Sequence, residues 1–158
     1  MKKLIIMLSA ILPIMAVNVY GFSDVPNGHW AESYITRVYD AGIMQGVGNN
    51  EFGFGQNVKK SEFITMLCNM MNWEVTKKEG VWYEPYVEAG YKHGIIDSLN
   101  ISANDFITRK EMAEMLIKSL GFNGVETDGS PFRDVNNSYI TAAHDFGIIS
   151  GKGNGFFA

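Results

Sequence analysis

The residue types that could carry chemistry in this 158-residue chain are its histidines, its glycine-rich loops and its carboxylates. His29, His93 and His144 lack the His-x₃-His or Cys-x₂-Cys spacing of a zinc site. The Gly-x-Gly runs at 46–48 and 151–155 follow no apolar strand and contain no Gly-Lys-Ser/Thr, so neither predicts a phosphate loop. Calcium-loop, serine-nucleophile and glycosidase carboxylate-pair patterns are also missing from the sequence. We therefore expect no enzyme activity, no cofactor and no metal, and we look for a binding function.

The best local signal in the chain is Thr108-Arg109-Lys110-Glu111. The Thr108 hydroxyl can accept a hydrogen bond from the Glu111 amide, and the Glu111 carboxylate can accept one from the Thr108 amide. Such a capping box contributes about 1 kcal/mol to a helix start. We therefore expect a helix to begin at Arg109 and assign Glu111 a structural role.

An internal repeat organises the chain. Trp30 and Trp82 lie 52 positions apart, as do Gly42 and Gly94, and a third copy of the pattern ends at Gly147. Repetition at this spacing indicates one supersecondary unit used several times, with cores completed by neighbouring units.

Each repeat is predicted to contain two helices joined by a glycine-rich loop, which places the chain in the mainly all-α class. Apolar residues at helical spacing predict helices over 31–41, 60–71, 84–92 and 109–120. In the second of these, the predicted buried stripe is Phe63, Met66, Leu67 and Met70. Gly42 and Gly94 are expected to end the first and third helices, because the residue after a helix often needs a positive φ.

The first 21 residues form a separate segment. Lys2 and Lys3 precede an apolar run at 4–17, and Gly21 is small enough for a cleavage site. A membrane span needs about 20 apolar residues, whereas this run is interrupted by Pro13. We expect a removed signal peptide, a secreted protein and no transmembrane span after removal; an uncleaved anchor is the alternative.

Composition limits the class of partner. Hydrophobic residues are 46% and charged residues 19%, as in a globular protein, and the net charge is −4. An acidic chain does not suit the nucleic-acid backbone, so we expect no nucleic-acid partner. Cys68 is the single cysteine, which excludes an internal disulfide. It is predicted to be buried among apolar neighbours, with a reactive or intermolecular thiol as the alternative.

These signals divide the chain into a signal peptide (1–21), a first repeat (22–73), a second repeat (74–122), a linker (123–131) and a partial third repeat (132–158). The third repeat lacks a counterpart of the Trp30 segment and reaches 158 where a second helix is expected. We therefore expect exposed apolar surface near Ile148, Ile149, Phe156 and Phe157, and possible self-association through this incomplete repeat. Asp24 and Asp134 are expected to be turn or cap residues.

Four motifs, in their order along the chain, resemble the S-layer homology (SLH) repeat: Phe22-Ser23-Asp24-Val25-Pro26, His29-Trp30-Ala31, Gly42-Ile43-Met44-x-Gly46 and Thr108-Arg109-Lys110-Glu111. The resemblance implies tandem helix–loop–helix repeats arranged about a pseudo-threefold axis as a three-pronged spindle, here with an incomplete third prong. It also implies a noncovalent anchor that binds secondary cell-wall polysaccharides, often bearing pyruvate ketals.

The same resemblance implies which residues bind the glycan. Arg109 matches the family's arginine, and Lys60 stands where the first repeat would have it. A guanidinium presents a bidentate fork to a carboxylate, whereas lysine supplies charge without that geometry. The full set of predicted glycan-binding residues is Arg109, Lys60, Trp30, Trp82 and Thr108, with Glu111 and Glu62 as structural caps. Trp30 and Trp82 have a second interpretation, as core anchors.

The functional hypothesis is noncovalent anchoring of a secreted protein to the bacterial cell wall or S-layer surface, through an anionic and pyruvylated secondary cell-wall polysaccharide. Two alternatives stay open. The chain could be a structural or protein-interaction scaffold of the envelope without glycan binding, or the anchoring fragment of a longer exoenzyme.

Overall fold

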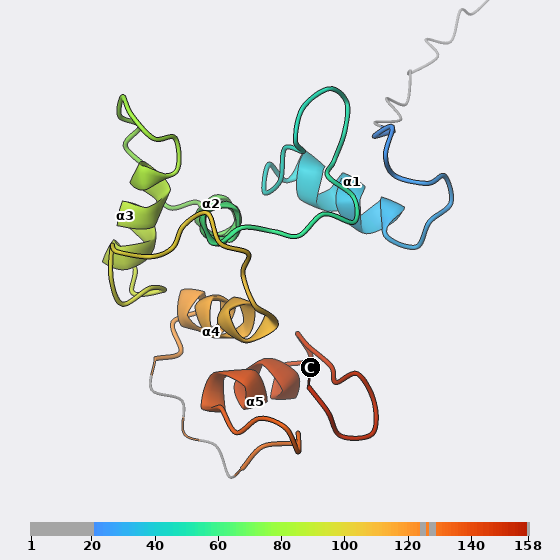
Figure 1. Cartoon of the computed structure of the whole chain (residues 1–158), viewed down its shortest axis with the longest axis vertical. Helices are drawn as coiled ribbons and strands as arrows, with labels where there is room; N and C mark the ends of the chain where they lie inside the picture. Colours follow the sequence, from blue (N-terminus) through green and yellow to red (C-terminus); the bar gives the residue numbers. More distant parts are fainter. Residues whose placement is uncertain (1–20, 124–125, 127–128, 158) are drawn as a thin grey trace, which may run out of the picture.

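The computed structural model describes residues 21–123, 126 and 129–157, and its regular structure is helical (Figure 1). Its helices are α1 (Glu32–Asp40), α2 (Lys60–Met70), α3 (Glu84–Lys92), α4 (Arg109–Ser119) and α5 (Ser138–Asp145). The only β-pairing among the described residues consists of isolated bridges such as Gly48 with Glu51. The predicted mainly all-α class is confirmed, and the three-pronged spindle stays a prediction.

Two predicted segments fall largely or partly outside this description. All of the signal peptide except Gly21 lies outside the described residues, as do 124–125 and 127–128 of the linker. Within the described ranges, none of the helices has the length and hydropathy to cross a membrane.

Glycine follows the ends of α1 and α3, the first helices of their repeats, as the sequence predicts. Gly42 and Gly94 both have a φ of 71°, a conformation that costs glycine little. The next residue then turns back onto each helix: the Ile43 amide donates to the Val38 carbonyl at 2.9 Å, and the Ile95 amide donates to the Gly90 carbonyl at 3.0 Å.

The helices pair across repeats and not within them. α2 packs against α3, α4 packs against α5, and α2 touches α4, whereas α1 contacts none of the other described helices (Figure 1). In the first and second repeats, two helices are joined by a loop, as predicted, but these two described helices do not pack against each other. The second helix of one repeat packs on the first helix of the next, because a long loop separates the two helices of a repeat.

Small side chains explain this pairing. Ala89 and Gly90 on α3, and Ala142 and Ala143 on α5, are buried against the preceding helix. A Cβ added at Gly90 would lie 3.1 Å from Cγ2 of Ile64, so α2 and α3 approach as closely as glycine permits.

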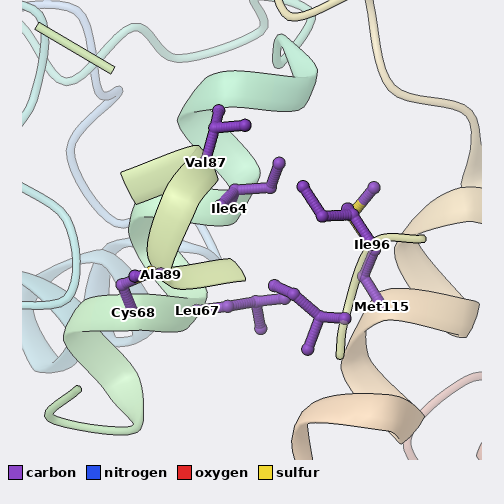
Figure 2. Packing of buried hydrophobic residues seen from close by; sticks show 8 residues of the cluster. Ile64, Leu67, Cys68, Val87, Ala89, Ile96 and Met115 are labelled. Carbon is purple, nitrogen blue, oxygen red and sulfur yellow. The ribbon is translucent and has the colours of Figure 1, made fainter. Parts of the chain in front are cut away.

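Two apolar cores result, and α4 contributes to both. The first core joins α2, α3 and α4 and includes Ile64, Leu67, Val87, Ile96 and Met115 (Figure 2). The second joins α4 and α5 through residues such as Ala113, Ile117, Ile140, Ala143 and Phe157. Helix α4 therefore couples the second repeat to both of its neighbours.

The buried face of α2 differs from the predicted stripe, because α2 contacts both α3 and α4. Ile64, Leu67 and Cys68 are buried, whereas Met70 is exposed. The stripe is rotated relative to the prediction, because α2 must face α3 and α4 together.

In each helix pair, an aromatic contact joins the residues just after the C-terminal ends of the two helices. The rings of Trp73 and His93 stack 4.0 Å apart, joining the residues that follow α2 and α3. In the next pair, the rings of Phe122 and Phe146 lie 4.9 Å apart at the same two places. The aromatic contact is thus part of the repeating unit.

The glycine-rich loops of the first and third repeats are organised by an aspartate, as expected. Asp24 accepts hydrogen bonds from the amides of Phe52, Gly53 and Phe54 at 2.7–2.8 Å, and Asp134 accepts one from the Phe157 amide at 2.8 Å. Desolvation raises the pKa of Asp24, but the amide donors outweigh it and hold that pKa below its ordinary value.

This loop geometry decides which apolar residues of the third repeat are exposed. Ile148 and Phe156 are exposed as predicted, and Ile149 is half-buried. Phe157 is only 3% exposed, so the prediction of exposed surface there is wrong. Its ring packs against Phe132 with a centroid distance of 5.4 Å, once Asp134 has fixed its amide.

The close approach of α3 to α2 predicts the effect of Gly90→Val. The new methyl groups would overlap Ile64, so we expect the free energy of unfolding to fall by about 1–3 kcal/mol. The matched control is Tyr91→Val, next along the helix and half exposed, which should change stability by less than about 0.5 kcal/mol. Equal urea midpoints for the wild type and Gly90→Val would contradict this packing.

Burial also predicts the reactivity of Cys68. The side chain is 1% exposed, and burial raises the pKa of its thiol to about 11, so at pH 8 it is a protonated thiol. We expect a thiol reagent to label the native protein only as fast as the protein unfolds, and to label it rapidly in urea. Native labelling at the rate of a small free thiol would show that the site is open.

Candidate functional site

Arg109 lies at the contact between the second and third repeats. Its two terminal nitrogens donate to the backbone carbonyls of Ser150 and Phe157, and its guanidinium carbon lies 4.4 Å from the centre of the Phe157 ring. A guanidinium held by two carbonyls and an aromatic face is a positioned cation. It joins the start of α4 to the loop of the third repeat.

Lys60 occupies the corresponding contact between the first and second repeats. Its Nζ lies 2.6 Å from Oε1 of Glu111, and its backbone amide donates to the Asp105 carbonyl at 3.0 Å. Both predicted cations thus begin a second helix of their repeat and reach into the following repeat. Lys60 forms an ion pair with a carboxylate, whereas Arg109 donates hydrogen bonds to neutral carbonyl oxygens.

The capping arrangements at these helix starts differ. At α4, the Thr108 hydroxyl accepts from the Glu111 amide at 3.2 Å, and Oε2 of Glu111 accepts from the Thr108 amide at 2.8 Å. At α2, Oε2 of Glu62 accepts from the Lys59 amide at 2.8 Å, but Lys59 offers no hydroxyl to complete the exchange. The first repeat therefore contains only the glutamate half of the box.

Glu111 has two roles, which its pKa reflects. Partial burial raises the pKa of Glu111, but hydrogen bonds from Lys60 and Thr108 outweigh burial and hold it below its ordinary value. One carboxylate thus caps α4 and ties α2 to it.

Trp30 and Trp82 are surface residues. Trp30 is 76% exposed and Trp82 is 56% exposed, so their interpretation as core anchors is wrong. The physical reason is their position just before α1 and α3, away from the faces that other helices cover. The Trp30 ring lies 5.3 Å from the ring of His29 and 6.2 Å from that of Tyr34. The Trp82 ring lies 5.5 Å from the ring of Tyr83 and 6.5 Å from that of Tyr86.

The structure brings some of the predicted residues together and not others. Lys60, Thr108 and Glu111 form one hydrogen-bonded cluster, and Arg109 adjoins it on α4. Within the described residues, no cation–π contact links either tryptophan to Arg109 or Lys60. No set of three potential metal ligands gathers in this part of the chain either.

Sequence reasoning did not anticipate a hollow of about 350 Å³ beside α3. It is lined by Tyr83, Leu99 and Ile101, and also by the carboxylates of Glu84 and Glu88. None of the residues that line this hollow is a cation, and Glu84 is acidic, so the hollow does not suit an acidic glycan. The carboxylates are one helical turn apart, a spacing visible in the sequence, but the opposing loop is brought there only by the fold.

Comparison with known proteins establishes the family. The S-layer homology domain profile matches residues 21–64 and 75–113, which together exceed half of the chain, and the chain belongs to this family. An amylopullulanase of Thermoanaerobacterium thermosulfurigenes is 30% identical over 87% of this chain and 8% of its own length. The S-layer protein sap of Bacillus anthracis is 27% identical over 72% of this chain and 16% of its own.

These relatives define the class of protein at a coarse level. They include S-layer proteins and enzymes, among them the exoglucanase XynX of Acetivibrio thermocellus, of which the chain covers 14%. The chain spans less than a fifth of the length of the curated relatives it matches. It is an S-layer homology module for cell-surface anchoring, a class that is itself not catalytic.

The double role of Glu111 predicts a pH-dependent effect of Glu111→Gln. A carboxylate with a lowered pKa stabilises the fold above its unfolded pKa, and that stability is lost as the pH falls through the folded pKa. We expect Glu111→Gln to destabilise the protein by about 1 kcal/mol at pH 7, with the difference vanishing in acid below the lowered pKa.

Urea unfolding at several pH values measures this effect. The control is Glu88→Gln, which removes a similarly short contact of 2.6 Å to Lys78 between half-exposed side chains and should change stability little. If Glu111→Gln lowered the free energy of unfolding by the same amount from neutral to strongly acid pH, the stabilising role assigned to the ionised Glu111 carboxylate would be refuted.

Proposed function

We propose that this module anchors a secreted protein to the cell wall by binding an anionic, pyruvylated secondary cell-wall polysaccharide. The observation that carries the proposal is the position of Arg109 and Lys60, two cations that begin equivalent helices where successive repeats meet. The family membership of the chain supports an envelope ligand.

The chemistry of Arg109 fits a carboxylate. Its two described hydrogen bonds go to neutral carbonyl oxygens, so no carboxylate of the described chain neutralises its charge. A guanidinium has five N–H donors, and two bonds leave others for a ketal-linked carboxylate. Lys60 is already paired with Glu111, so we assign Arg109 the main charge contact and Lys60 a lesser one.

The exposed tryptophans suit the neutral part of such a ligand. An indole ring can cover the C–H face of a sugar, and both Trp30 and Trp82 are accessible. Thr108 is exposed beside Arg109 and completes the proposed set. The cargo carried by the module is proposed by analogy with relatives that are enzymes or S-layer proteins.

One observation favours a second candidate function, an envelope scaffold without glycan binding. Arg109 holds the third repeat through Ser150 and Phe157, which a purely structural role would explain. The two functions differ in whether a free polysaccharide binds.

The experiment measures affinity of the purified protein for pyruvylated wall polysaccharide and for the same polymer after hydrolysis of its ketals. We expect binding only to the pyruvylated form. Arg109→Ala should weaken it by about 1.5–3 kcal/mol because a charge-assisted hydrogen bond is lost, and Arg109→Lys should recover part of the loss.

The control variant is Lys110→Ala, which removes the same charge from the adjacent exposed position and should leave affinity nearly unchanged. Circular dichroism verifies that Arg109→Ala retains its helices. Equal binding to both polymers would reject the carboxylate role, and no binding to either would favour the scaffold.

A further inference from the structure

Helix α1 presents an aromatic and cationic strip that differs from every other described helix face. Trp30, Tyr34 and Arg37 follow one another at helical spacing and lie on one side of the helix. The Trp30 and Tyr34 rings are 6.2 Å apart, and the Arg37 guanidinium carbon is 5.8 Å from the centre of the Tyr34 ring. All three side chains are exposed.

The equivalent positions of α3 and α5 carry small residues, which allow another helix to pack closely. Where α1 has Arg37, α3 has Ala89 and α5 has Ala142, both buried against the preceding helix. The next position is Gly90 in α3 and Ala143 in α5, whereas α1 has the bulkier Val38. These small residues let α3 approach α2 closely, and let α5 approach α4 closely.

The C-terminal end of α1 also lacks a feature that α3 and α5 use in helix pairing. His93 and Phe146 cap α3 and α5 and make the aromatic contacts that close those pairs, but Ala41 occupies this place in α1. A helix docked on α1 as α2 docks on α3 would meet no aromatic partner there, and it would bury the Arg37 guanidinium without a carboxylate. The face of α1 is therefore poorly suited to a helix.

The charges around the strip leave the guanidinium open to an anion. In the described part of the chain, Arg37 makes no ion pair within 4.0 Å, although Asp40 lies one turn further along α1. The carboxylate of Glu32 is turned to the other end of the helix, where it accepts a hydrogen bond from the Gly28 amide at 2.8 Å.

We infer that this strip, Trp30–Tyr34–Arg37, is a separate subsite for an acidic saccharide. The Trp30 and Tyr34 rings meet edge to face at 66°, so each ring contacts a differently oriented C–H surface of the saccharide, and Arg37 forms a bidentate contact with a sugar carboxylate. The inference rests on the proposed function for its ligand, but it assigns a charge contact on α1, apart from Arg109 on α4.

Calorimetry of the full chain with pyruvylated wall polysaccharide, native and after ketal hydrolysis, tests the subsite. We expect Arg37→Ala to weaken binding of the native polymer about tenfold, and Arg37→Lys to weaken it less. Tyr34→Ala should weaken binding as well. The control is Arg133→Ala, an exposed arginine outside α1 whose loss should leave affinity unchanged.

The outcomes separate this inference from the proposed function. Wild-type binding that is lost in Arg109→Ala but unchanged in Arg37→Ala and Tyr34→Ala overturns the subsite and leaves the proposed function standing. Failure of the wild type to bind either polymer overturns both. If sedimentation shows that Arg37→Ala and Tyr34→Ala alter self-association while affinity is unchanged, the strip is a protein contact and the inference is wrong.

Discussion

The close approach of each second helix to the first helix of the following repeat governs the rest of this structure. It depends on Ala89 and Gly90 in one pair and on Ala142 and Ala143 in the other, where a larger side chain would separate the helices. Because these pairs cross the repeat boundary, the apolar faces of α2 and α4 are buried by helices of the following repeat. Stability is consequently shared between neighbours, as in other repeat proteins.

The same crossing explains where the cations lie. A residue that begins a second helix faces the following repeat, so the Lys60 side chain meets Glu111 in the first turn of α4, and Arg109 meets the loop carbonyls of Ser150 and Phe157. Each is therefore part of the structure between repeats as well as a candidate ligand contact. Arg109 differs from Lys60 in having no carboxylate partner among the described residues, and such a cation suits the acidic ligand proposed above.

Local signals in the sequence predicted the elements well. Apolar spacing, Gly42, Gly94 and the Thr108–Glu111 box are all local, and the bounds of α1 to α4 agree with expectation to within one residue at each end, whereas no bounds were predicted for α5. The buried stripe of α2 was mispredicted, and the interpretation of Trp30 as a core anchor was wrong, because each depends on which distant segment covers a face. No local pattern in the sequence marked Arg37 as a candidate binding residue. It becomes unusual only when it is aligned with Ala89 and Ala142, which are buried at the equivalent positions of α3 and α5.

By itself, the sequence determined the family, the repeat spacing, the all-α class and the residue types available for binding, because these are properties of local pattern and order. Only the tertiary structure decided that helices pair across repeats, that Phe157 is buried beneath Arg109, and that no other described helix covers the face of α1 carrying Arg37. Those outcomes depend on packing between residues far apart in the chain, where a few small side chains select which surfaces meet.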